Sequence, residues 1–258
     1  MALLQVPGAT LYYEDAGGGG TPVVFMHPAS GSADSWQFQL NPFQSSGYRT
    51  ITYDLRGWAR SRPDPGATDS GCMSDDLLAL VDSLQLDRFV LIAAAYGGFG
   101  GVDFGLRFPG RLKAFVLSAS QGGIADPTYT AIRERVVSAP IRSLPIELRE
   151  LGPSYRTRDP EGVERWLQIT HAAGEPPASA RQRTHLQITL PMLAGLAVPT
   201  MLIAGGADLL APPALMHQIA SHIPTHDFLT ACESGHCVHW EYPEMWNRQV
   251  LEFLAKHQ

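Results

Sequence analysis

The chain has 258 residues, 45% of them hydrophobic, and a formal net charge of −6. A chain of this size and composition buries one large core, so one α/β domain with an insertion is expected rather than two independent domains. The charged residues form no basic cluster. This argues against a nucleic-acid partner, because phosphate binding requires concentrated Lys and Arg.

Two further features indicate the compartment. No apolar run approaches membrane-spanning length, and residues 1–8 lack the basic and long apolar regions of a signal peptide. The three cysteines, Cys72, Cys232 and Cys237, are an odd number that suits a reducing compartment better than a disulfide framework. We therefore expect a cytoplasmic protein with no membrane partner.

Strands and helices are predicted to alternate along the first 120 residues. Apolar runs predict strands over 11–14 and from about residues 23, 50, 89 and 112, and helices are predicted over 75–84 and up to residue 108. Strands that alternate with helices indicate a mostly parallel sheet covered by helices on both faces. The predicted fold class is therefore α/β.

The alternation stops after residue 120. From there to about residue 192 no comparable strand occurs, and amphipathic pieces over 129–137 and 162–170 are predicted as helices. Prolines separate these pieces at positions 140, 145, 153, 160, 176 and 177. A strand resumes at residue 200, and helices over 213–223 and 244–255 follow. We interpret 1–120 and 193–258 as the core, and 121–192 as a helical cap inserted over the strand ends.

The most informative stretch is residues 89–101. An apolar run up to Ala94 predicts a buried strand, Gly97 and Gly98 follow, and an apolar segment then predicts a helix. In a G-x-S-x-G nucleophile elbow, the residue in the tight turn between strand and helix has a strained backbone and presents its side chain above the sheet. Ala95 occupies that position, so the elbow lacks its hydroxyl group.

Other predicted strands also end in polar or reactive residues. The strand from residue 23 ends at His27, the strand from residue 50 ends at Asp54, and Asp208 and His236 follow later strands. In an open α/β sheet, ligands bind beyond the carboxyl ends of the strands. These residues are therefore expected to gather around Ala95.

This ordered set of motifs resembles the α/β-hydrolase family over essentially the whole chain. The pattern D-x-R-G-x-x-x-S is present at 54–61, the elbow lies at 93–97, and positions 95, 208 and 236 follow the family's order of nucleophile, acid and histidine. Two departures stand out. Pro28 replaces a usual glycine, and Ala93 and Ala95 replace the first glycine and the serine of the elbow.

The resemblance implies a catalytic site made of position 95, Asp208 and His236, with no cofactor. Asp208 would orient His236, and His236 would act as the base. The family's oxyanion donors are main-chain N–H groups after the nucleophile and in the loop after the first core strand, which implies Ala29 and Tyr96. The 54–61 motif is usually a structural turn in the family, so we assign it no catalytic role.

Aromatic side chains are candidates for the walls of a substrate pocket, although each is equally compatible with the core. The candidates are Trp36, Phe99, Tyr129, Tyr155, Trp166 and Trp240. Residues 235–241 also resemble the corresponding segment of meta-cleavage product hydrolases, which split carbon–carbon bonds. The glycine-rich loop of those enzymes is not reproduced at 27–31, so their substrate class is one alternative.

No metal site is predicted. The remaining histidines at 217, 222, 226 and 239 lack the compact ligand spacing of a zinc motif. The expected partner is a small-molecule carbonyl substrate, and the sequence leaves a homodimer open.

Three explanations of Ala95 compete. The first is a hydrolase of an ester, lactone or related carbonyl compound in which serine has been altered to alanine, so that substrate is trapped. The second is a non-hydrolytic His–Asp base catalyst of the lyase or cofactor-free oxygenase type. The third is a catalytically dead ligand-binding protein. We favour the first, because drift after loss of catalysis should also have eroded Asp208 and His236.

Overall fold

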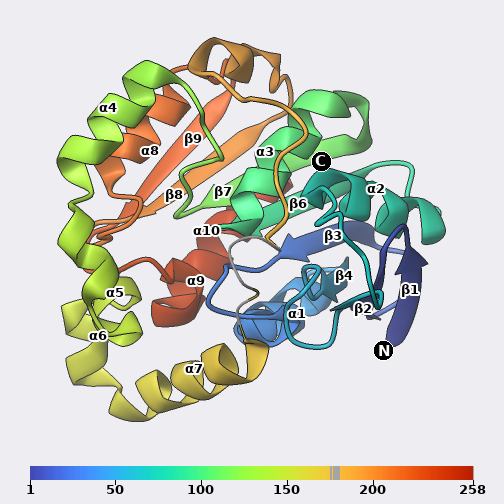
Figure 1. Cartoon of the computed structure of the whole chain (residues 1–258), viewed down its shortest axis with the longest axis horizontal. Coiled ribbons are helices and arrows are strands. Elements are labelled where there is room, and N and C mark those ends of the chain that lie inside the picture. The colour runs from blue at the N-terminus through green and yellow to red at the C-terminus, as the bar shows by residue number, and fades with distance from the viewer. Residues whose placement is uncertain (175, 177–180, 258) are drawn as a thin grey trace.

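A central sheet organises the molecule (Figure 1). The computed structural model describes residues 1–174, 176 and 181–257; Pro177, one of the predicted cap prolines, lies outside them. Within the described residues, nine strands form one sheet in the order β1-β2-β4-β3-β6-β7-β8-β9, with β5 paired to β2. The strands are β1 (Ala2–Val6), β2 (Ala9–Asp15), β3 (Thr21–Met26), β4 (Tyr48–Tyr53), β5 (Arg62–Pro63), β6 (Phe89–Ala94), β7 (Leu112–Ser118), β8 (Thr200–Gly205) and β9 (His226–Ala231).

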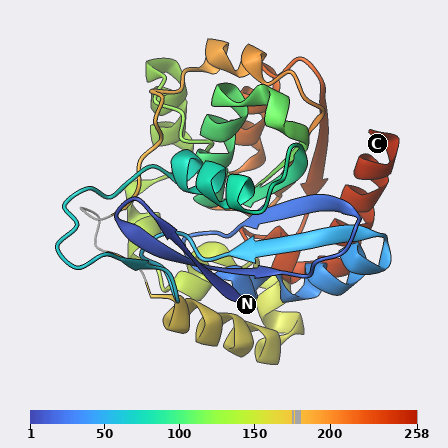
Figure 2. The same ribbon diagram turned by 90° about the vertical axis from the view of Figure 1, so that its right-hand side faces the viewer.

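The sheet is mostly parallel, as predicted. Strands β3, β4, β6, β7, β8 and β9 run parallel, and the pairs that involve β2 are antiparallel. Helices α1 (Gln37–Ser45) and α10 (Pro243–Lys256) pack on one face. Helices α2 (Met73–Ser83), α3 (Gly97–Arg107) and α8 (Pro213–Ala220) pack on the other (Figures 1 and 2).

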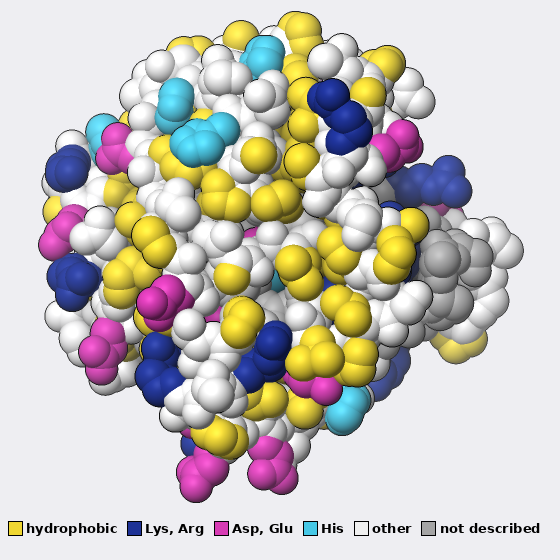
Figure 3. Space-filling view, turned by 90° about the vertical axis from the view of Figure 1, so that its left-hand side faces the viewer, with side chains coloured by type: hydrophobic (Ala, Val, Ile, Leu, Met, Phe, Trp, Pro, Cys, Tyr) yellow, Lys and Arg dark blue, Asp and Glu magenta, His cyan; other side chains and the backbone are white. Residues whose placement is uncertain are grey.

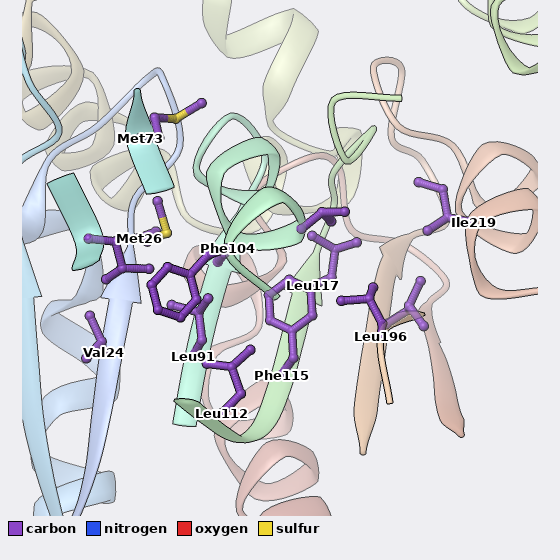
Figure 4. Packing of buried hydrophobic residues seen from close by; sticks show 14 of the residues in the cluster. Val24, Met26, Met73, Leu91, Phe104, Leu112, Phe115, Leu117, Leu196 and Ile219 are labelled. Carbon is purple, nitrogen blue, oxygen red and sulfur yellow. The ribbon is translucent and has the colours of Figure 1, made fainter. Parts of the chain in front are cut away.

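The core follows the two-residue period of the strands. In β3, Val24 and Met26 pack beneath α2 and α3, while Val23 and Phe25 face α1 and α10. Figure 4 shows Val24 and Met26 in the same layer as Phe104 of α3. Because both faces of these strands are buried, the strands are continuously apolar. The core therefore holds the carboxyl ends of the parallel strands at one edge.

The insertion between β7 and β8 is helical, as predicted. It contains α4 (Pro127–Val136), α5 (Ile146–Glu150), α6 (Pro153–Arg158) and α7 (Pro160–Ala173); the first three lie at the left of Figure 1 and α7 at the bottom. Short 3-10 helices lie at Ala139–Ser143 and Leu190–Gly195, and a short helix, α9 (Val238–Glu241), precedes α10. Several prolines begin helices instead of only separating them, because a proline at the first position loses no helical hydrogen bond.

The surface is mixed in character. Figure 3 shows acidic, basic and apolar side chains interspersed on one face of the molecule. Among the described residues, no helix has both the length and the apolar character needed to cross a membrane.

Candidate active site

Ala95 has the backbone of a nucleophile elbow. Its φ is +48°, in the left-handed region, and it lies between the end of β6 and the start of α3. A Cβ atom at Gly97 would lie 2.7 Å from the carbonyl oxygens of Met26 and His27, so glycine is needed for α3 to begin this close to β3. The turn therefore has the tight geometry that the sequence predicts.

Main-chain and side-chain hydrogen bonds hold this turn. The N–H of Ala95 donates to the carbonyl of Ser118 at 2.9 Å. The carbonyl of Ala95 accepts the N–H of Gly98 at 3.1 Å and the hydroxyl of Ser120 at 2.5 Å. Ser120 was not among the predicted site residues, although its place just after a neighbouring strand was a usable signal. It acts as a brace between the ends of β6 and β7.

Asp208 and His236 form a buried hydrogen-bonded pair. The Nδ1 atom of His236 is 2.7 Å from Oδ2 of Asp208, and the other carboxylate oxygen accepts the N–H groups of Leu210 and Ala211 at 2.7 and 2.9 Å. One oxygen thus builds the turn before α8, and the other orients the ring. With Nδ1 as donor, Nε2 of His236 is left as the proton acceptor.

The electrostatics favour a charged His236. Burial by itself disfavours the imidazolium ion, but the negative charge and hydrogen bond of Asp208 outweigh burial and raise the pKa of His236 above its usual value. The neighbouring His239 is buried, and burial together with the charge of His236 lowers its pKa to about 3. Of the two neighbouring imidazoles, His236 is therefore the stronger base.

The loop that carries His236 is clamped to the cap. The N–H of His236 donates to the carbonyl of Glu150 at 2.7 Å. The buried carboxylate of Glu241 accepts the N–H groups of Gly152 and Gly235 at 2.9 and 3.0 Å. A Cβ atom at Gly152 would lie 2.8 Å from the nitrogen of Gly235, so this approach needs glycine. The sequence prediction did not include this clamp.

His27 orients the peptide that carries the first expected oxyanion donor. Its Nε2 accepts the N–H of Leu55 at 2.8 Å, so the proton is on Nδ1, which donates to the carbonyl of Pro28 at 2.7 Å. Burial lowers the pKa of His27 and keeps the ring neutral. In a trans peptide the N–H points opposite to the carbonyl, so His27 sets the direction of the Ala29 N–H.

The N–H groups of both expected oxyanion donors lack an acceptor among the residues that the structure describes. Within the described parts of the chain, no protein acceptor is recorded for the N–H of Ala29 or of Tyr96. Tyr96 precedes the first turn of α3, where the helix dipole is positive. Its side chain is held separately, by a hydrogen bond to the carbonyl of Gln182 at 2.6 Å. An oxyanion hole at these two groups stays a prediction that this hydrogen-bond pattern supports.

The 54–61 motif is structural, as expected. Asp54 accepts the N–H of Ala33 at 2.8 Å and pairs with Arg60 at 2.7 Å. The hydroxyl of Ser61 donates to the Asp54 carbonyl at 2.6 Å, and Arg56 pairs with Asp76 at 2.5 Å. These contacts fix the loop next to the site, where the indole N–H of Trp58 donates to the carbonyl of Ala29 at 2.8 Å.

Two of the six aromatic candidates for pocket walls, Trp36 and Trp240, lie in the core. Trp36 is fully buried and packs against Phe25 and His239, with ring centroids 5.1 and 4.5 Å apart. Trp240 is 1% exposed and packs against Phe38 at 4.8 Å. An aromatic residue fits a core and a pocket wall equally well, and burial here assigns both residues to the core.

A cavity of about 660 Å³ lies beside the elbow. Phe99 of α3 and Tyr96 just before this helix line it, and residues 181–187 line it where the chain returns from the cap. Its described lining does not include Ala95, Asp208 or His236. Ala95 and His236 are only 7% and 9% exposed, and Tyr96 is the predicted site residue that the cavity touches.

The four histidines considered for a metal do not form one site. The ring of His217 stacks on Phe228 at 3.8 Å, and the rings of His222 and His226 contact backbone carbonyls at 2.9 and 2.8 Å. His239 is buried beside Trp36. A different group of potential metal ligands lies at the start of α2.

The fold and the site define an α/β-hydrolase. A family model described as the alpha/beta hydrolase family matches residues 23–249, and the chain belongs to this family. The mostly parallel sheet, the helices on both faces and the helical insert agree with it.

Three particular proteins illustrate the relationship. The chain is 28% identical to a 2-hydroxy-6-oxononadienedioate/2-hydroxy-6-oxononatrienedioate hydrolase of Paraburkholderia xenovorans (strain LB400), over 95% of this chain and 90% of that protein. A malate-bound thermophilic esterase from Thermogutta terrifontis is 27% identical, with a TM-score of 0.80 over 99% of this chain and 97% of that one. The enol-lactonase from Burkholderia xenovorans LB400 shares the fold at 20% identity, with a TM-score of 0.77 over 98% of this chain and 100% of that one.

Proposed function

We propose that this chain has the binding and proton-transfer groups of a serine hydrolase for an ester, lactone or related carbonyl substrate, in a form with alanine at the nucleophile position. The observation that carries the proposal is the turn at Ala95, where a left-handed backbone after β6 leads directly into the N-terminus of α3. A left-handed conformation costs a residue with a Cβ atom about 1–2 kcal/mol, and glycine would avoid that cost. The turn therefore retains the geometry that presents a side chain at position 95.

The surrounding groups supply the rest of an acyl-transfer site. With serine at position 95, the hydroxyl oxygen attacks the carbonyl carbon and its proton passes to Nε2 of His236. Asp208 stabilises the imidazolium, and the N–H groups of Ala29 and Tyr96 receive the oxyanion. His236 then gives the proton to the leaving oxygen, and water hydrolyses the acyl-enzyme by the same route.

The cavity favours a substrate with a carboxylate group. Arg133, Arg181 and Arg183 line the space next to Tyr96, and guanidinium groups bind carboxylates through paired hydrogen bonds. The name of the relative from Paraburkholderia xenovorans describes a dicarboxylate. We therefore place the carbonyl at the elbow and an anionic end of the substrate in the cavity.

One observation favours a second candidate function. The Asp208–His236 pair and the N–H groups of Ala29 and Tyr96 are in place without a side-chain nucleophile. Such a site can remove an acidic substrate proton and stabilise the resulting oxyanion, which would make the Ala95 chain itself a base catalyst.

One experiment separates the two functions. The Ala95 chain and its Ala95→Ser variant are assayed on esters, lactones and vinylogous diketones, each with and without a terminal carboxylate. We expect the serine form to hydrolyse a panel member that the alanine form binds by calorimetry without releasing product. Equal hydrolysis by both forms would refute the assignment of position 95 as the nucleophile. Turnover by the Ala95 chain that His236→Ala abolishes would establish the base catalyst.

The substrate class has its own control. Carboxylate-bearing compounds should have a lower KM than their neutral counterparts, and Arg133→Gln should reduce that difference. A KM that is independent of the carboxylate would contradict the assignment of the cavity, while leaving the Ala95→Ser result unaffected.

A further inference from the structure

The start of α2 and the chain returning from the cap meet on the wall of a second cavity, of about 910 Å³. Cys72, just before α2, forms an isolated parallel β-bridge with Arg183. Cys72, Asp75 and His185 all line the cavity. These three side chains therefore come from two segments that the backbone holds together, more than 100 positions apart in the sequence.

The three side chains offer a thiol, a carboxylate and an imidazole to one point. Their ligand atoms all lie within 4.8 Å of one another. A tetrahedral zinc ion with bonds of about 2.0–2.3 Å needs ligand atoms about 3.3–3.8 Å apart. Asp75 and His185 are exposed and Cys72 is half-buried, so side-chain rotation can bring the atoms together. Three protein ligands leave the fourth position to water.

Neighbouring groups support these ligands as the outer shell of a metal site does. The buried carboxylate of Asp103 accepts the main-chain N–H of His185 at 3.0 Å, which fixes the backbone that carries the imidazole, and it accepts the thiol of Cys72 at 3.6 Å. Arg107 donates to one oxygen of Asp75 at 2.6 Å and leaves the other oxygen for a metal. Hydrogen bonds of this kind orient metal ligands and contribute to affinity.

The types of donor atom indicate which metal the site would take. A thiolate and an imidazole together favour zinc over magnesium or calcium, which prefer oxygen ligands.

We propose that Cys72, Asp75 and His185 bind one zinc ion, with the thiol proton of Cys72 released to solvent and water as the fourth ligand. The site is separate from the Asp208–His236 pair and takes no part in the proposed hydrolysis. Because His185 lies on the segment that also lines the cavity next to Tyr96, zinc would fasten this wall to α2.

The test uses tag-free protein stripped with EDTA. Calorimetric titration with ZnCl2 should show one ion per chain, and Co²⁺ should give a thiolate-to-cobalt charge-transfer band. Cys72→Ser should abolish the band, and Asp75→Asn and His185→Gln should each weaken zinc binding by roughly 10- to 100-fold or more. Cys232→Ser, which changes an exposed cysteine elsewhere, is the matched control and should leave both signals unchanged.

Three results would overturn the proposal: no stoichiometric zinc binding, a cobalt band that persists in Cys72→Ser, or a band lost in Cys232→Ser. A second readout covers a variant that fails to fold. Zinc should raise the Tm of the unaltered chain and of Cys232→Ser by on the order of several degrees, because it binds only the folded state. An unchanged Tm at saturating zinc would also contradict the site.

Discussion

Two neighbouring strands are each followed by an alanine with a left-handed backbone, but the N–H of the residue after that alanine has different surroundings in the two turns. Ala95 after β6 has a φ of +48°, and Ala119 after β7 has a φ of +46°. The next N–H in the second turn, that of Ser120, donates to the sulfur of Met216 at 3.3 Å. The next N–H in the first turn, that of Tyr96, has no recorded acceptor among the described residues and precedes a helix.

The difference shows that backbone strain alone does not mark a catalytic position. Both turns carry the same conformational cost, but only the Ala95 turn combines it with an unpaired N–H at a helix N-terminus. Strain at Ala119 instead positions Ser120, whose hydroxyl braces the Ala95 carbonyl. One turn is thus the candidate site, and the other is its support.

The largest expected effect is on hydrolysis, and it should occur with serine in the Ala95 turn but not in the Ala119 turn. Ala95→Ser should raise the hydrolysis of p-nitrophenyl acetate by several orders of magnitude, up to about 10⁶-fold, because removing a triad nucleophile costs that much. Ala119→Ser places the same hydroxyl in the same backbone conformation and should give no gain. Stopped-flow burst measurements would test both, and equal activation of the two variants would remove the distinction.

The second effect tests whether the hydroxyl works with the buried pair. In the Ala95→Ser protein, His236→Ala should cost nearly as much kcat as removal of the serine, and Asp208→Asn about 10⁴-fold. The losses should not add in the double variant, because members of a triad act as one unit. Additive losses in steady-state kinetics would show that these residues act separately.

A smaller effect concerns pH. In the Ala95→Ser protein, His236 must be neutral to accept a proton, so kcat/KM should rise with pH through a pKa above the ordinary 6.5 of histidine. In Asp208→Asn the charge that raises this pKa is lost while burial remains, so the acid limb should move below 6.5. A pH–rate profile with the same limb in both proteins would contradict the role of Asp208.

The smallest expected effect is on stability and tests the backbone strain at Ala95. Ala95→Gly should raise the free energy of unfolding by about 0.5–1 kcal/mol, because glycine adopts the left-handed conformation without the Cβ penalty. Ala119→Gly should be nearly neutral, since its methyl group belongs to the core and its loss offsets the relief. Urea denaturation would measure both; a destabilised Ala95→Gly would show that the turn is unstrained.

Much of the fold and the positions of the candidate catalytic residues could be predicted because they follow from strand ends. Continuous apolar strands and the glycines after them indicate the elbow, and the acid and the histidine follow later strands of the same sheet. The elbow geometry and the Asp208–His236 contact agree with that prediction.

The supports of the site could not be predicted, since they are contacts between distant segments. The hydroxyl of Ser120 reaches back to residue 95, and Glu241 binds a glycine 89 positions away. Spacing within the sequence likewise could not bring Cys72 next to His185. Trp36 shows the same limit in another form, because its residue type suits a pocket wall and its three-dimensional packing places it in the core.

The hydrogen bonds of Glu241 couple the position of the cap to that of the His236 loop. The carboxylate accepts one N–H from the cap, that of Gly152, and one from the core, that of Gly235. The residue after Gly235 is His236. Any displacement of α6 would therefore also disturb the loop that carries His236, the proposed proton acceptor. If His236 acts as we propose, its alignment depends on the position of the cap.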